Sequence, residues 1–191
     1  MRVLLLFLAL LLAAACSPSP KFNATDLTGI EWGKDFALTD HHGNPRRLAD
    51  FRGRAVVLFF GYTQCPDVCP TTMGNMREVM QVLGPEAAKV QVLFVSVDPE
   101  RDTPQLLAQY VPAFHSSFLG LHGDAAAIEA TAKEFKVFYR KQAGSSPTTY
   151  SVDHTAGSYV FDPRGRLRLY LRHGETPERV AQDLRRLLAG E

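Results

Sequence analysis

The chain has no excess of charge of either sign. Its 191 residues include 21 Lys and Arg against 20 Asp and Glu, and no run of basic residues stands out. Because such a surface attracts phosphate backbones and anionic lipid only weakly, the sequence argues against nucleic-acid binding. Internal repeats and low-complexity segments are also absent. A hydrophobic fraction of 46% over this length is enough for one compact domain.

A long hydrophobic run is missing as well. Arg2 is followed by thirteen uncharged residues, Val3 to Ala15. As a helix they reach only about 20 Å, which is short of a hydrocarbon core of roughly 30 Å. A charged start, an apolar stretch and small residues before Cys16 form the layout of a signal peptide. We therefore expect residues 1–15 to be a signal peptide.

Cys16 resembles the lipidated cysteine of a bacterial lipoprotein cleavage box. The resemblance has one departure, because Ala13 stands where that box usually has Leu. We expect Cys16 to become the acylated first residue of the mature chain, with residues 16–23 as a tether and 24–191 as the folded domain. Ordinary cleavage and an uncleaved short anchor are the alternatives.

Cysteine is scarce, with three residues in all. If Cys16 is acylated, Cys65 and Cys69 remain as an even pair, as expected for a protein in an oxidising compartment. Two thiols four positions apart can hold a soft metal ion or close into a disulfide. A purely structural disulfide is disfavoured, because closing so small a loop contributes only about 2 kcal/mol.

The hydrophobic pattern predicts strands that alternate with helices. Apolar runs and turn signals predict a first hairpin around residues 36–48, followed by strands at 55–60, 90–97, 118–121, 158–161 and 166–171. Caps and helical periodicity predict helices at 70–83, 104–114, 125–134 and 177–188. Residues 143–152 are predicted to be a polar loop. This order is typical of an α/β, thioredoxin-like fold with a central mixed β-sheet flanked by helices and an N-terminal β-hairpin extension.

The cysteine pair stands at the start of the first predicted helix. Pro70 fits a first helical turn, so Cys69 lies where unpaired N–H groups and the helix dipole should stabilise a thiolate. Met73, Met76 and Met80 share one face of this helix with other apolar residues. We interpret that face as core packing rather than as a thioether relay for copper.

His154 is the candidate for a third ligand. Two thiolates select a soft ion such as Cu(I), and an imidazole makes the same site acceptable to Cu(II). A thioredoxin-like topology would bring the segment before Ser158 against the start of the first helix. From position alone, a structural role for this histidine remains open.

Five segments, in order, resemble the Sco/SenC family, and the resemblance spans roughly residues 24–188. They are Phe51-Arg-Gly-Arg54, Phe59-Phe-Gly-Tyr-Thr-Gln-Cys-Pro-Asp-Val-Cys-Pro70, Ser96-Val-Asp-Pro-Glu-Arg-Asp-Thr103, and Val152-Asp-His-Thr155 with Phe161-Asp-Pro-Arg-Gly165. The resemblance implies a membrane-tethered copper protein that helps assemble the binuclear copper centre of cytochrome c oxidase. It also implies that Cys65, Cys69 and His154 ligate one copper ion, as Cu(I) or Cu(II).

The resemblance further implies partners and a location. The partners are the copper-bearing subunit of the oxidase and, in addition, periplasmic copper carriers or thiol reductants. The location is the periplasmic side of the bacterial inner membrane. Asp67 and Asp98 also match family positions near the metal loop. Whether they act on the site or only satisfy turns stays open, so neither is counted as a site residue.

Two enzyme classes remain as alternatives. A thiol-disulfide oxidoreductase could work through Cys65 and Cys69, but catalytic thioredoxins have two residues between their cysteines and a proline opposite them. This chain has three residues between them and no proline just before Ser158. A peroxidase is disfavoured because neither cysteine has a threonine three residues before it. We expect copper delivery rather than enzyme turnover, with accessory thiol exchange left open.

Overall fold

The computed structural model describes residues 22–146 and 149–191. The predicted signal peptide, Cys16 and most of the predicted tether lie outside these ranges. Among the described residues, no helix is both long enough and apolar enough to cross a bilayer.

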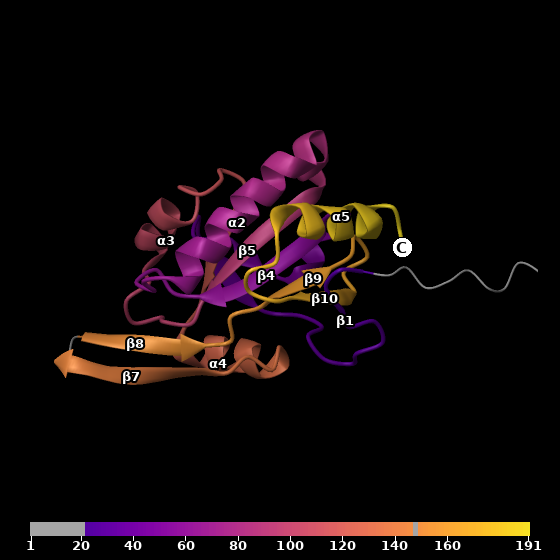
Figure 1. The fold of residues 1–191 in the computed structure, drawn as a ribbon. Coiled ribbons are helices and arrows are strands. Elements are labelled where there is room, and N and C mark those ends of the chain that lie inside the picture. The colour runs from indigo at the N-terminus through magenta and orange to yellow at the C-terminus, as the bar shows by residue number, and fades with distance from the viewer. Residues whose placement is uncertain (1–21, 147–148) are drawn as a thin grey trace, which may run out of the picture.

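An eight-stranded mixed sheet forms the centre of the molecule (Figure 1). β4 runs parallel to β5 and antiparallel to β9, and β5 runs parallel to β6. The central pair, β4 and β5, is buried along its whole length, as the apolar runs predict. In spatial order the strands are β1 (Thr25–Asp26), β10 (Leu167–Leu171), β9 (Ser158–Phe161), β4 (Ala55–Gly61), β5 (Val90–Ser96), β6 (Leu119–His122), β2 (Leu38–Asp40) and β3 (Pro45–Arg46).

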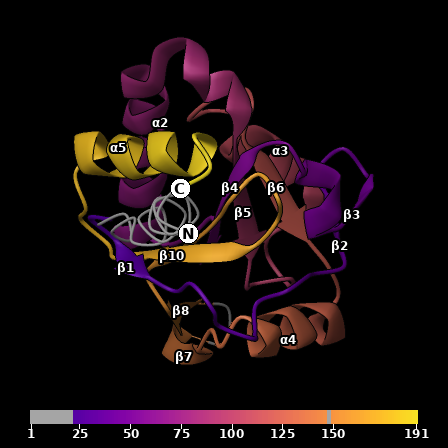
Figure 2. The same ribbon diagram turned by 90° about the vertical axis from the view of Figure 1, so that its right-hand side faces the viewer.

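Helices cover both faces of this sheet (Figure 2). Adjacent residues of β4 point to opposite faces, so the ring of Phe59 contacts Phe94 while that of Phe60 contacts Phe135, just after α4. In Figure 2, α2 and α5 lie above the strands and α4 lies below them. The helices are α2 (Val68–Leu83), α3 (Pro104–Tyr110), α4 (Ala125–Glu134) and α5 (Pro177–Leu188), with short 3₁₀ helices η1 (Leu48–Phe51) and η2 (Gly84–Lys89).

The three predicted N-cap positions, Thr103, Asp124 and Thr176, are confirmed, and two of the three side chains make the capping hydrogen bond. The side chains of Thr103 and Asp124 accept the backbone N–H bonds that cap α3 and α4. Thr176 precedes α5 without a side-chain cap bond. α3 ends at Tyr110 rather than near residue 114, and Pro112, two residues later, has no N–H to donate.

The predicted polar loop at 143–152 is wrong. Residues 143–146 and 149–152 belong to a second, two-stranded sheet made of β7 (Tyr139–Ser146) and β8 (Thr149–His154) (Figure 1). Gly144 and its polar neighbours read as a loop, but the paired segments also carry Tyr150 and Val152, which favour strands. His154 is therefore the last residue of a strand.

Asn23, the last residue of the predicted tether, contacts the folded body. The buried carboxylate of Asp183 on α5 accepts hydrogen bonds from the backbone N of Asn23 at 3.0 Å and of Ala24 at 2.8 Å. The folded body thus reaches back to Asn23.

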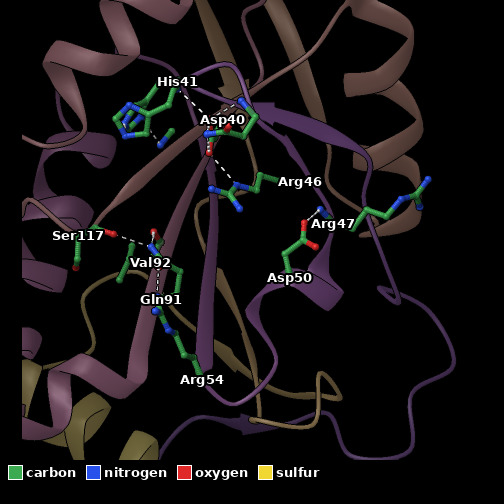
Figure 3. Close-up of polar contacts among 12 residues, drawn as sticks. Asp40, His41, Arg46, Arg47, Asp50, Arg54, Gln91, Val92 and Ser117 are labelled. Carbon is green, nitrogen blue, oxygen red and sulfur yellow. Dashed lines mark hydrogen bonds and ion pairs between the residues drawn. The ribbon is translucent and has the colours of Figure 1, made fainter.

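The predicted N-terminal hairpin is formed by β2 and β3 and joins the sheet edge through β6. Its turn closes around the buried carboxylate of Asp40 (Figure 3). Asp40 accepts hydrogen bonds from the backbone N of His42, from the backbone N and side-chain amide of Asn44, and from Nε of Arg46. Burial acts to raise the pKa of Asp40, but these donors outweigh it and lower the pKa to about 2.

Asp40 should therefore stabilise the fold above the pKa of an unfolded aspartate and lose that contribution in acid. Because the pKa is lower in the folded state, the contribution is full above about pH 4 and disappears as the pH falls toward about 2. Asp40→Asn should lower the free energy of unfolding at pH 7 by about 1–3 kcal/mol and weaken its dependence on pH in that window. Urea unfolding at pH 7 and pH 3 measures both. Asp26→Asn, on the exposed strand β1, is the control, and equal losses in the two variants would contradict this role.

Candidate metal centre

Three side chains that the sequence singles out lie together in the structure. One ligand atom each from Cys65, Cys69 and His154 lie within 4.8 Å of one another. Sγ of Cys69 is 3.4 Å from Nε2 of His154. An ion bound at roughly 2.3 Å from sulfur and 2.0 Å from nitrogen in tetrahedral geometry sets these atoms about 3.5 Å apart. The group could hold a metal ion.

The two cysteines lie where β4 passes into α2. Cys65 is in the connecting loop and partly buried, while Cys69 is the second residue of α2 and fully buried. The backbone N of Cys69 donates to Sγ of Cys65 at 3.4 Å. A donor from the first turn of a helix favours negative charge on the sulfur that accepts it. The helix start therefore directs one backbone N–H donor at the sulfur of Cys65.

Burial has the largest effect on the pKa of Cys69. It raises the pKa of the thiol far above its usual value, and a backbone hydrogen bond from Tyr62 offsets only part of this effect. The expectation that the helix start stabilises a thiolate at Cys69 is therefore wrong for the thiol on its own. A metal ion deprotonates a coordinating thiol directly, because its positive charge lies next to the sulfur.

His154 is oriented as a ligand requires. Its Nδ1 donates to the carbonyl O of Thr155 at 3.0 Å, which leaves the lone pair of Nε2 on the side of Cys69. Its ring meets the rings of Phe59 and Tyr62 edge to face. Burial lowers the pKa of His154 below its ordinary value, so the imidazole is neutral at neutral pH.

Sequence reasoning missed Asp102. This buried carboxylate accepts hydrogen bonds from the backbone N of Thr63 at 3.0 Å, from Oγ1 of Thr63 at 2.6 Å and from Oγ of Ser96 at 2.7 Å. Burial raises its pKa, with the hydrogen bonds acting in the opposite sense. Asp102 thus fixes the start of the cysteine loop against the end of β5. The segment from Ser96 to Thr103 carries Asp102 and resembles the family. The sequence still does not predict that Asp102 bonds to Thr63, which lies 39 positions away in the chain.

The remaining residues weighed from the sequence are not among the three candidate ligands. Asp67 precedes α2 but does not cap it with its side chain. Asp98 is buried and accepts hydrogen bonds from Arg101 and from Oη of Tyr150. The methionine face of α2 is buried, which agrees with core packing and comprises Met73, Met76 and Met80.

Comparison with known proteins agrees with the sequence resemblance. The family model described as SCO1/SenC matches residues 25–189. The chain belongs to the SCO1/SenC family. A curated Sco relative, "Protein SCO2 homolog, mitochondrial" from Bos taurus, is 39% identical over 157 residues, which cover 81% of this chain and 59% of that protein. The chain thus spans about three fifths of the length of this relative.

Solved Sco structures share the fold. Apo Sco1 from Thermus thermophilus is 44% identical with a TM-score of 0.79, covering 90% of this chain and 99% of that one. ScoI from Bradyrhizobium japonicum, solved with copper bound, is 39% identical with a TM-score of 0.76 and covers 82% and 99%. The predicted thioredoxin-like fold is confirmed, and Cys65, Cys69 and His154 could form a copper site in this chain.

Gly61, at the end of β4, makes room for the buried sulfur. A Cβ placed there would lie 2.8 Å from Sγ of Cys69 and 2.9 Å from the ring atoms of Phe59 and of Phe94. Gly61→Ala should therefore displace the sulfur and destabilise the fold by about 1–3 kcal/mol, measured by urea unfolding. Gly74→Ala, in the interior of α2, should be neutral or stabilising, because the added Cβ would meet no atom within 4 Å other than the nearby backbone of its own helix. A Gly61→Ala protein as stable as wild type would contradict the close packing.

Proposed function

We propose that this Sco protein binds one copper ion through Cys65, Cys69 and His154 and delivers it to the binuclear copper centre of cytochrome c oxidase. The observation that carries the proposal is the meeting of three ligand atoms within 4.8 Å. Two of these residues, Cys69 and His154, are separated by 85 positions in the chain.

The chemistry of the donor set favours copper. Two thiolates prefer soft Cu(I), and the imidazole adds a nitrogen that suits Cu(II), so one site can accept either valence. The Bradyrhizobium japonicum relative is solved with copper bound. Because this chain is 39% identical to that relative and presents two thiols and an imidazole at one place, the same cargo is the best-supported proposal.

Delivery, rather than permanent storage, fits a three-ligand site. A closed four-ligand site commits its metal to folding, whereas three protein ligands leave one position through which a partner can take the ion. Cys65 is only partly buried, so an incoming ligand can approach from its side. The SCO1/SenC family takes part in copper assembly of cytochrome c oxidase, and the copper-bearing subunit of that oxidase is the recipient we propose.

We further propose where the chain acts. Residues 1–15 direct it out of the cytoplasm, and acylation of Cys16 holds it at the periplasmic side of the bacterial inner membrane. The residues from 16 to about 22 then tether the domain. Mass analysis of the membrane-extracted protein tests this directly, since acylation adds the mass of the lipid to a chain that begins at Cys16.

Thiol-disulfide exchange is the second candidate. Both sulfurs are free and lie within 4.8 Å of each other. In such an exchange Cys65 and Cys69 would lose two protons and two electrons to form one disulfide, while the disulfide of the oxidase copper site becomes two thiols. The described residues contain no cis peptide bond, so the cis-proline that faces the cysteines of catalytic thioredoxins has no counterpart among them.

Copper titration of the reduced protein tests the first candidate. Wild type should bind one equivalent, and Cys65→Ser, Cys69→Ser and His154→Ala should each weaken binding by more than ~100-fold, because a lost ligand costs more than a lost supporting contact. His42→Ala, which removes an exposed imidazole on the β2–β3 turn, is the matched control. Unchanged affinity in His154→Ala would contradict the ligand set.

Oxidation separates the two candidates. The disulfide form has no thiolates to offer, so it should bind copper at least ~100-fold more weakly than the dithiol form. If exchange is the main activity, His154→Ala should reduce a disulfide-bonded oxidase fragment as fast as wild type while Cys65→Ser does not. If delivery is the main activity, His154→Ala should fail to metallate the same fragment after its cysteines have been reduced. Equal copper affinity in both redox forms would contradict thiolate ligation.

A further inference from the structure

The strand that carries His154 is not part of the main sheet. β7 and β8 pair only with each other, in a separate two-stranded sheet (Figure 1). The two cysteines, in contrast, follow β4 at the centre of the eight-stranded sheet. Pairing with the main sheet therefore does not extend to the strand that carries the imidazole. A three-residue link joins His154 to Ser158 of β9, and contacts between the hairpin and the body must fix the rest of the distance between the imidazole and the sulfurs.

Arg101 makes contacts to both sides. Its Nη1 donates to the carbonyl O of Tyr150 on β8 at 2.9 Å and to Oε1 of Gln64, the residue before Cys65, at 3.2 Å. Its guanidinium carbon lies 3.5 Å from the ring centroid of Tyr150. One side chain thus joins the residue beside a cysteine to the strand that ends at His154.

Asp98 holds this guanidinium in place. Its fully buried carboxylate accepts from Nε of Arg101 at 2.5 Å and from Oη of Tyr150 at 2.7 Å. Arg101 itself is only 16% exposed. Hydrogen bonds between buried ionised partners are short and strong, and a planar guanidinium can bond along its edge while it stacks on a ring face. Asp98, Arg101 and Tyr150 therefore form a rigid connection, which we call the hairpin clamp.

A second contact joins the same loop to the hairpin. Nζ of Lys141 on β7 pairs with Glu100 at 2.5 Å and lies 4.7 Å from the ring centroid of Tyr150. Both Lys141 and Glu100 are well exposed, so this pair contributes little by itself. The buried contacts of Arg101 carry most of the connection.

We propose that Arg101 is a positioning residue for copper binding, which acts by holding the His154 strand at ligand distance from the cysteine loop. This inference rests on the proposed function. It assigns Arg101 no contact with the metal. Lysine cannot replace it fully, because an ammonium group on a flexible stem does not bond to Asp98, Gln64 and Tyr150 while stacking on a ring.

A double-mutant cycle tests the proposal, because a positioning residue acts only through the ligand that it positions. Arg101→Gln should weaken copper affinity of the reduced protein by ~10- to 100-fold, the range typical of contacts that orient a ligand. In a His154→Ala background, the same substitution should change affinity by less than about 3-fold. An equal loss in both backgrounds would show that Arg101 supports the fold or the cysteines instead, and would overturn the proposal.

Three further measurements complete the test. Arg179→Gln, which removes an exposed arginine paired with Glu175 on the surface, should leave copper affinity unchanged. Hydrogen exchange without copper should show faster exchange of residues 149–154 in Arg101→Gln and no change in β4 and β5, and unchanged exchange in the hairpin would overturn the proposal. If Arg101→Gln does not fold, Tyr150→Phe takes its place in the cycle, since it removes only the hydroxyl that bonds to Asp98.

These outcomes separate the inference from the proposed function. If wild type binds no copper, the proposed function fails, while hydrogen exchange still reports whether Arg101 holds the hairpin. If wild type binds copper and the cycle shows no coupling between Arg101 and His154, only the positioning role fails.

Discussion

The burial of one sulfur is the constraint on which the site depends. Cys69 has no exposed surface, lies against Gly61 at the end of a fully buried strand, and meets the imidazole of His154 from the other side. Burial raises the pKa of its thiol, so the sulfur loses its proton readily only when a positive ion takes the proton's place. The same burial makes the imidazole neutral. The buried sulfur of Cys69 is therefore suited to a bound soft cation rather than to general thiolate reactions, and Cys65 is the more exposed of the two thiols.

The central strands β4 and β5 and the helix α2 could be predicted from the sequence, because each is marked by a pattern of residues within its own segment. The apolar runs of β4 and β5 are each seven residues long and buried throughout, and the periodic apolar face of α2 ends at Gly84. A helix that follows a central strand after a short loop places Cys65 and Cys69 at the carboxyl end of that strand. The candidate third ligand, His154, emerged from topology together with the family resemblance rather than from any local pattern.

The remainder could not be predicted because it depends on contacts between distant segments. Gly144 and its polar neighbours are typical of a loop, so the sequence does not predict the β7–β8 hairpin. The hairpin is defined by the pairing of its two strands with each other. In the sequence Asp102 is an ordinary charged residue of a turn. Only the structure shows that Thr63 and Ser96 donate hydrogen bonds to it. The sequence likewise does not predict that burial raises the pKa of Cys69. A helix start alone suggests a lower pKa, and the surrounding core reverses that direction.

X-ray absorption at the copper edge of the reduced, copper-loaded protein tests the central claim most directly. The account predicts a first shell of two sulfurs at about 2.3 Å and one nitrogen at about 2.0 Å, with the nitrogen scattering lost in His154→Ala. A shell with fewer than two sulfurs, or a nitrogen signal that persists without His154, would contradict it.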